Sequence, residues 1–164
     1  MLQVQRVERR LENPKVEVQI FPTAPFKMKF ITWKQPLGNS ECPYAYRWLI
    51  DFYFFSIRLH QWISSDDLRY FHDHPTWFAT IVLSGSYVDI SPKGEEQLNI
   101  GSFRFRPALY KHKVKVSQGG CWTLLVFGKH FREWGFYAPK KSGRIIWLKA
   151  KRYFLRFGHH PCDK

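Results

Sequence analysis

The sequence is poor in cysteine and in long apolar runs, and each shortage excludes a class of protein. Its three cysteines, Cys42, Cys121 and Cys162, lie far apart and form no CxxC pair. Because a secreted disulfide framework usually contains an even number of cysteines, this pattern predicts reduced thiols. No run approaches the roughly 18 apolar residues of a membrane-spanning helix. Residues 1–14 lack the apolar core of a signal peptide. We therefore expect a cytoplasmic protein without a transmembrane segment.

Acidic residues are scarce as well. The chain has 13 Asp and Glu against 26 Lys and Arg, which gives a formal net charge of +13. Such a chain attracts anions, whether phosphate, nucleic acid or an acidic partner, although the same charge also serves solubility. The 164 residues, 45% of them hydrophobic, suffice for one domain with a core of its own.

Short apolar or alternating segments, separated by Gly, Pro and polar turns, follow one another along most of the chain. Residues 15–21 and 26–33 alternate with period two, and residues 46–62 are rich in aromatics. Residues 76–85 are apolar at odd and even positions alike, as in a strand buried on both faces. Three more short strands are expected in LNIGSFRFRP, HKVKVS and CWTLLVF, with a polar connection at 91–97 and a hairpin turn at Gly119–Gly120. This spacing predicts an all-β sandwich or barrel.

The C-terminal segment 138–164 differs from the rest. Between Lys140 and Arg156 it carries seven basic residues and no acidic one, interleaved with apolar side chains. It predicts a basic amphipathic helix, or a strand followed by a tail, that contacts nucleic acid or a membrane surface. The simpler alternative, which we favour, is a packed terminal segment with a solvated basic face.

One pair of histidines has the spacing of metal ligands. His72 and His74 share one face of a strand because side chains alternate. Two imidazoles on one face can bind one ion at about 2.0–2.1 Å each. His112 lies in the next β-rich block and is the best candidate for a third ligand. An HxH pair alone is weak evidence, since seven histidines produce such pairs by chance.

Residues 72–116 resemble the two motifs of the cupin superfamily, G-x5-H-x-H-x3,4-E-x6-G and G-x5-P-x-G-x2-H-x3-N. The matching positions are His72, His74 and Gly85 in the first motif and Gly101, Pro107 and His112 in the second. The segments HDHPTWF, IVLSGSY, WTLLVFGKH and REWGF are similar to those of small bacterial and phage cupin-like proteins. The resemblance implies one jelly-roll β-barrel over residues 1–164, with its core at about 46–137, a short N-terminal extension and the basic C-terminal segment.

The departures from these motifs concern the ligand set. Asp66 stands at the first glycine, Phe78 or Ala79 at the glutamate, Leu109 at the second motif's glycine and Val116 at its asparagine. A three-histidine site remains, which the resemblance links to iron; zinc, nickel, copper and manganese also suit imidazole ligands. The alternative is a barrel that has lost its metal. Asp89 is an outside candidate for a fourth ligand.

The alternation of side chains along a strand predicts which residues line such a site. If His72 and His74 point inward, so do Phe78, Thr80 and Val82, whereas Asp73 points away and pairs with a strand neighbour.

Other side chains come near the site from neighbouring strands. The inward set around His60 is expected to include Arg58 and Phe54, with His60 as a ligand, a catalytic base or a packed core histidine. Arg104 and Arg106 share one face and bind an anionic substrate if it is the inner face; otherwise they face solvent. Trp134 is expected to close one end of the barrel, beside the substrate. Asp66 and Asp67 are assigned to a turn.

Two function classes follow. The first is a metal-dependent enzyme with dioxygenase-like chemistry on a small anionic or nucleotide-linked substrate, or an isomerase that uses His60 as its base. The second is a non-catalytic module that holds a metal or ligand and presents its basic surface to nucleic acid or protein. The resemblance also implies a homodimer formed through sheet edges.

Overall fold

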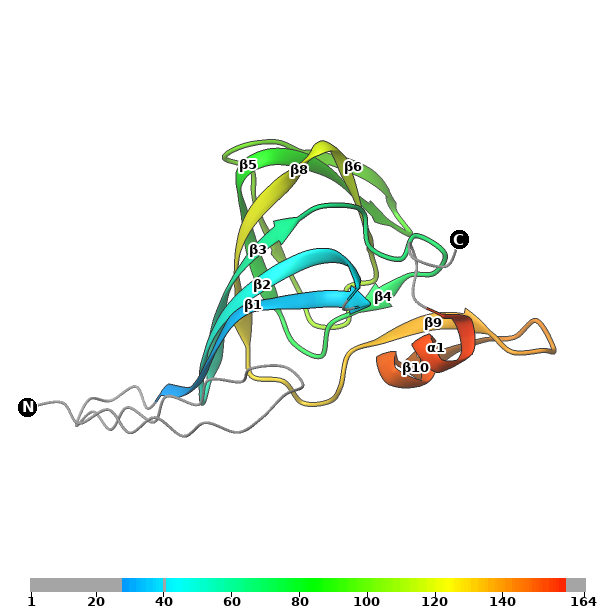
Figure 1. The fold of residues 1–164 in the computed structure, drawn as a ribbon. Helices are drawn as coiled ribbons and strands as arrows, with labels where there is room; N and C mark the ends of the chain where they lie inside the picture. The colour runs from blue at the N-terminus through cyan, green and yellow to red at the C-terminus, as the bar shows by residue number, and fades with distance from the viewer. Residues whose placement is uncertain (1–27, 40, 159–164) are drawn as a thin grey trace, which may run out of the picture.

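The computed structural model describes residues 28–39 and 41–158, and this part of the chain is almost entirely β-structure (Figure 1). The expected strand at 15–21 lies outside the described residues. The elements are β1 (Met28–Asn39), β2 (Cys42–Phe52), β3 (Phe55–Trp62), β4 (His72–Asp73), β5 (Phe78–Ser91), β6 (Gly94–Leu98), β7 (Phe103–Arg106), β8 (Lys113–Gly128), β9 (Gly135–Pro139), β10 (Ile145–Lys149) and α1 (Ala150–Phe157).

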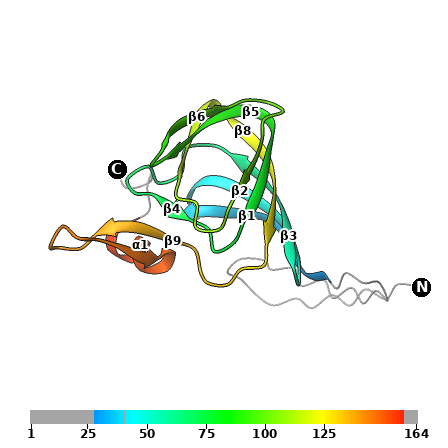
Figure 2. The same cartoon turned by 180° about the vertical axis from the view of Figure 1, so that it is seen from behind.

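The strands form two antiparallel sheets, which confirms the prediction of an all-β domain. The larger sheet has the order β1-β2-β3-β8-β5-β6, and β7 pairs with β5. The smaller sheet has the order β10-β9-β4. Seen from both sides, the larger sheet curves around the interior, and β9 and α1 lie beside it (Figures 1 and 2). A single bridge between His72 and His112 connects β4 with the start of β8, so the two sheets meet where the predicted ligands lie.

Long bent strands replace some of the short strands that we expected. The segments HKVKVS and CWTLLVF belong to one strand, β8, and the predicted hairpin turn at Gly119–Gly120 is wrong. Both glycines have positive φ inside β8, where the pairing with β5 shifts register. Gly85 on β5 also has positive φ, and a Cβ there would overlap the Gly120 carbonyl oxygen. Glycine at these positions allows the two strands to bend together.

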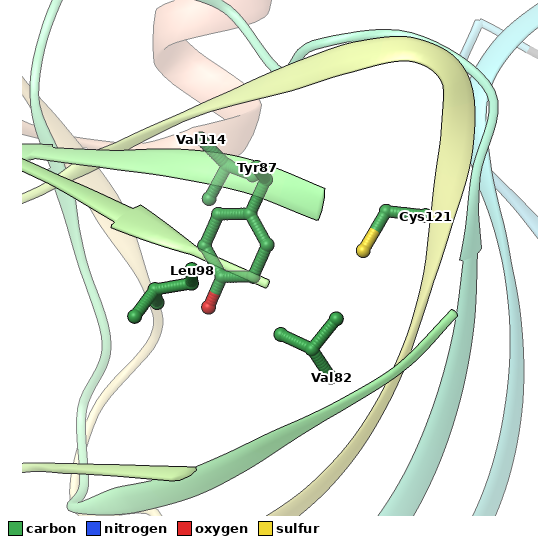
Figure 3. Close-up of a cluster of buried hydrophobic side chains, with 5 residues drawn as sticks. All are labelled: Val82, Tyr87, Leu98, Val114 and Cys121. Carbon is green, nitrogen blue, oxygen red and sulfur yellow. The ribbon is translucent and has the colours of Figure 1, made fainter. Parts of the chain in front are cut away.

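The interior of the larger sheet is apolar at one end. Figure 3 shows the buried cluster of Val82, Tyr87, Leu98, Val114 and Cys121. Val82 points inward as predicted, but β5 is not buried on both faces: its burial alternates along the strand. The Cys121 thiol is free, whereas Cys42 is disulfide-bonded, contrary to the prediction of reduced thiols.

The C-terminal segment combines the two structures considered for it, because β10 leads directly into α1. Tyr153 of α1 is fully buried, and its ring stacks on Phe136 of β9 with centroids 3.9 Å apart. The Tyr153 hydroxyl also donates a hydrogen bond to Asp67 at 2.6 Å. The seven basic side chains between 140 and 156 are all exposed, so this is a packed segment with a solvated basic face. Within the described part of the chain, no helix has the length and hydropathy needed to cross a bilayer.

Candidate metal centre

The three predicted histidines converge. The backbones of His72 and His112 exchange two hydrogen bonds, at 2.9 and 3.0 Å, which places their side chains next to each other. One ligand atom of each of His72, His74 and His112 lies within 4.8 Å of the other two. The Nε2 atoms of His74 and His112 are 3.1 Å apart. Two nitrogens that bind one ion at right angles, at about 2.1 Å each, lie about 3 Å apart. The three imidazoles therefore fit one transition-metal ion.

Two buried carboxylates stand behind these histidines. Asp89 Oδ1 lies 2.8 Å from His112 Nδ1 and accepts its hydrogen bond when that nitrogen is protonated. Asp66 Oδ2 lies 3.3 Å from His72 Nδ1, although the alignment is too poor for a hydrogen bond. A proton on His112 Nδ1 would leave its Nε2 lone pair for a metal, and carboxylate–histidine pairs like that of Asp89 and His112 orient ligands in metalloproteins.

The protonation states suit metal binding. Burial lowers the pKa of both His72 and His74 well below the usual value, and neighbouring histidines lower it further. These imidazoles are therefore neutral at pH 7, as metal ligands must be. Burial raises the pKa of Asp66 to about 8, against the effect of the hydrogen bond from the Val114 amide.

Asp89 contacts His112 and is not a member of the group of three ligand nitrogens. Its Oδ2 accepts hydrogen bonds from Arg106 Nε and Nη2, at 3.0 and 2.7 Å, and from the Tyr110 hydroxyl at 3.3 Å. Burial alone would raise the pKa of Asp89, but the hydrogen bonds from His112 and Arg106 keep it below its usual value. The sequence makes Asp89 an outside candidate for a fourth ligand, but its oxygens contact His112, Arg106 and Tyr110 instead.

The histidines open into a cavity of about 350 Å³. Phe78 and Thr80 line it, as parity predicted, and so do Arg58, His60 and Trp134. This volume lies at the lower end of the range for small-molecule sites. The arrangement thus combines neutral nitrogen ligands with space for a small molecule beside them.

Arg104 and Arg106 do not belong to the cavity lining. They pair across the strands with Thr80 and Phe78, so they lie on the inner face of the sheet. Their guanidinium groups instead bind carboxylates: Arg104 pairs with Glu96, and Arg106 with Glu96 and Asp89. Arg106 reaches the histidines only through Asp89, so we do not carry either arginine forward as a substrate ligand.

Asp73 points away from the cavity, as alternation predicted. It is fully buried and accepts hydrogen bonds from Arg132, Tyr137 and Trp147, the latter two on the neighbouring strands β9 and β10. Phe54 was expected to point inward, which is wrong: it precedes β3, in the turn after β2, and its side chain is 70% exposed. The alternation that the prediction used does not extend into that turn.

Sequence reasoning missed several residues of the cavity. Asp66 and Asp67 were assigned to a turn, yet both are buried and line the cavity, as do Arg47 and His130. Arg47 lies opposite His60 in the register of β2 and β3. No motif marks these positions. The register of β2 and β3 brings Arg47 beside His60, and the connections after β3 and β8 bring the other three residues to the cavity.

Comparisons with known proteins concern the fold. No family model and no curated protein matches the sequence. A cupin domain from Bordetella pertussis Tohama I is 18% identical and aligns over 56% of this chain and 99% of its own, with a TM-score of 0.45. An RmlC-like cupin from Shewanella frigidimarina NCIMB 400 is 14% identical over 60% of this chain and 87% of its own, with a TM-score of 0.48. A protein of unknown function with a cupin-like fold from Ralstonia eutropha JMP134 is 12% identical over 63% and 64%, with a TM-score of 0.42. Every one of these TM-scores lies below 0.5, so the similarities decide neither the family nor the substrate or reaction of this protein.

Proposed function

We propose that the protein binds one divalent transition metal through His72, His74 and His112 and is a metal-dependent enzyme for a small anionic substrate. One observation carries the proposal: three imidazoles converge at the wall of a 350 Å³ cavity. Structural zinc sites are closed by four protein ligands, whereas three protein ligands leave coordination positions open, as in catalytic sites. Among the described residues, no fourth side chain of the Cys, Asp or Glu type joins the group.

The bound metal would supply Lewis-acid or redox chemistry next to the cavity. Iron is our first choice and dioxygenase-like oxidation our first reaction class; zinc, nickel and manganese fit the same ligands. The chain's own residues would position the substrate. Arg58 would pair with its anionic group and Trp134 would contact it at the cavity wall. A nucleotide-linked substrate would place only its reacting part inside, given the cavity volume.

His60 is the candidate catalytic base. It lines the cavity, and neither of its ring nitrogens has a hydrogen-bond partner within the described part of the chain. Burial lowers its pKa well below the usual value, and Arg47 and Arg58 lower it further. An isomerase would require His60 to accept a proton, and an anion bound beside Arg47 and Arg58 would raise the pKa of its neutral imidazole toward the range of an efficient base.

Elemental analysis tests the metal site directly. The purified wild type should contain about one equivalent of transition metal, and the His72→Ala/His112→Ala double variant should contain none. Oxygen uptake with a panel of small carboxylates and phosphate esters then tests the reaction class. A protein that stays metal-free after incubation with Fe(II), Zn(II), Ni(II) and Mn(II) would refute the proposal.

A second candidate function is a non-catalytic module that binds nucleic acid. Its support is the run of exposed basic side chains on β10, α1 and the turn before them: Lys140, Lys141, Arg144, Lys149, Lys151, Arg152 and Arg156. Such binding would weaken steeply as salt rises, because phosphate contacts release counterions. A fluorescence-anisotropy titration with single- and double-stranded oligonucleotides at two salt concentrations distinguishes this function from the enzyme.

A further inference from the structure

A cluster of nitrogen donors lies in the cavity wall formed by β2 and β3. Arg47 and His60 are directly opposite each other across the two strands, and Arg58 lies two residues before His60 on the same face. All three side chains line the same cavity as the metal ligands. We call these three residues the guanidinium subsite.

Several of these donors lack partners. Arg47 Nε and both ring nitrogens of His60 are buried without a hydrogen bond among the described residues. Arg47 Nη2 donates to the Gln35 side-chain oxygen at 2.6 Å. Arg58 donates to Ser56 Oγ at 3.1 Å and to His130 Nε2 at 2.9 Å, and both of these partners are neutral. Buried polar groups in native proteins are nearly always hydrogen-bonded, and each unpaired one costs about 1–3 kcal/mol. A ligand that accepts hydrogen bonds would satisfy Arg47 Nε and the protonated ring nitrogen of His60.

The charge of the subsite specifies that ligand. Within the described part of the chain, no ion pair to a carboxylate is found for Arg47 or Arg58. Their positive field acts on the neighbouring His130: burial and the two arginines together lower its pKa to about 4. The Arg58 guanidinium also lies over the Phe127 ring, 3.9 Å from its centroid, which fixes its plane. Two fixed guanidinium groups that form no ion pair with the described carboxylates favour an anion with paired oxygens.

We propose that Arg47, Arg58 and His60 form the subsite that binds the carboxylate or phosphate group of the ligand. The proposal rests on the proposed function, since it places that anionic group in the cavity that the metal ligands share. Arg47 was not a sequence-level candidate, and it enters here because the strand register sets it beside His60. The substrate class thereby narrows to small molecules that carry a carboxylate or a phosphate.

Calorimetric titration of the full chain with inorganic phosphate and with malonate tests the subsite. Each titration is run on protein treated with EDTA and on protein loaded with Zn(II). In both forms, Arg58→Met and Arg47→Met should each weaken binding of at least one anion by about tenfold, the effect of losing one charge-assisted contact. Arg152→Met is the matched control, because it removes an exposed guanidinium on α1 and should leave binding unchanged. Arg58→Lys keeps the charge without the planar fork and covers the case in which Arg58→Met does not fold.

The outcomes separate the subsite from the metal site. Anion binding that depends on Arg47 and Arg58 in protein that takes up no metal would support the subsite and refute the metal proposal. One equivalent of metal, with anion binding that is absent or equal in the wild type and all arginine variants, would refute the subsite alone. An equal loss of anion affinity in Arg152→Met and Arg58→Met would also refute the subsite, because anion binding would then depend only on the net charge of the protein. A preference for phosphate over malonate, or the reverse, identifies the anionic group.

Discussion

Replacing Asp89 by asparagine should weaken metal binding without unfolding the protein. A carboxylate oxygen 2.8 Å from His112 Nδ1 favours the tautomer with its proton on Nδ1, which leaves the Nε2 lone pair toward His74. Asparagine can turn its NH2 group toward Nδ1, which would favour the other tautomer and place the proton on the ligating nitrogen. Loss of such an outer carboxylate usually costs about 10–100-fold in metal affinity, or about 1.4–2.7 kcal/mol.

The assay is a competition titration of Zn(II) against a chelating dye, with thermal unfolding of each variant measured in parallel. Glu96→Gln is the matched control: it removes the other carboxylate that pairs with Arg106 and leaves the contact between Asp89 and His112 in place. Its affinity for Zn(II) should stay within about twofold of wild type. A folded Asp89→Asn protein with unchanged affinity would refute the orienting role of Asp89, and an equal loss in Glu96→Gln would assign the effect to Arg106.

Three further predictions concern stability. Asp73→Ala leaves three hydrogen-bond donors unpaired around a fully buried position. The free energy of unfolding measured in urea should therefore fall by about 3–5 kcal/mol. A decrease below about 1 kcal/mol would contradict this estimate. Hydrogen bonds from Arg69 and Tyr153 outweigh burial and lower the pKa of Asp67, so its stabilisation is complete above the unfolded pKa of about 3.9 and is lost as pH falls through the folded value. Tyr153→Phe should therefore flatten the loss of stability between pH 5 and pH 3, as measured by thermal unfolding, and an unchanged slope would count against it. Gly85→Ala should lower the free energy of unfolding by more than about 2 kcal/mol, because the added Cβ would overlap the Gly120 carbonyl oxygen. Gly101→Ala should lower it by about 1 kcal/mol, because Gly101 has positive φ but open space around it. Equal decreases of melting temperature in the two variants would refute the steric argument.

Local patterns were sufficient for the fold class and for the three histidines. Alternation places His72 and His74 on one face and Asp73 on the other, and this needs only the two-residue period of a strand. The same reasoning failed where the period is broken. Gly119 and Gly120 were read as a turn because positive φ occurs both in turns and in bulges, and the sequence does not distinguish the two.

The long-range contacts around the site were decided by tertiary structure alone. The roles of Asp66 and Asp89 depend on which strands lie beside His72 and His112, and that pairing joins residues far apart in the chain. Arg104 and Arg106 lie on the predicted inner face, yet Glu96 and Asp89 neutralise them there. Residue type and spacing therefore determined which side chains can bind a metal. Tertiary structure determined which carboxylates lie beside those histidines and which arginines line the cavity without a carboxylate partner among the described residues, because hydrogen-bond partners depend on neighbours in space.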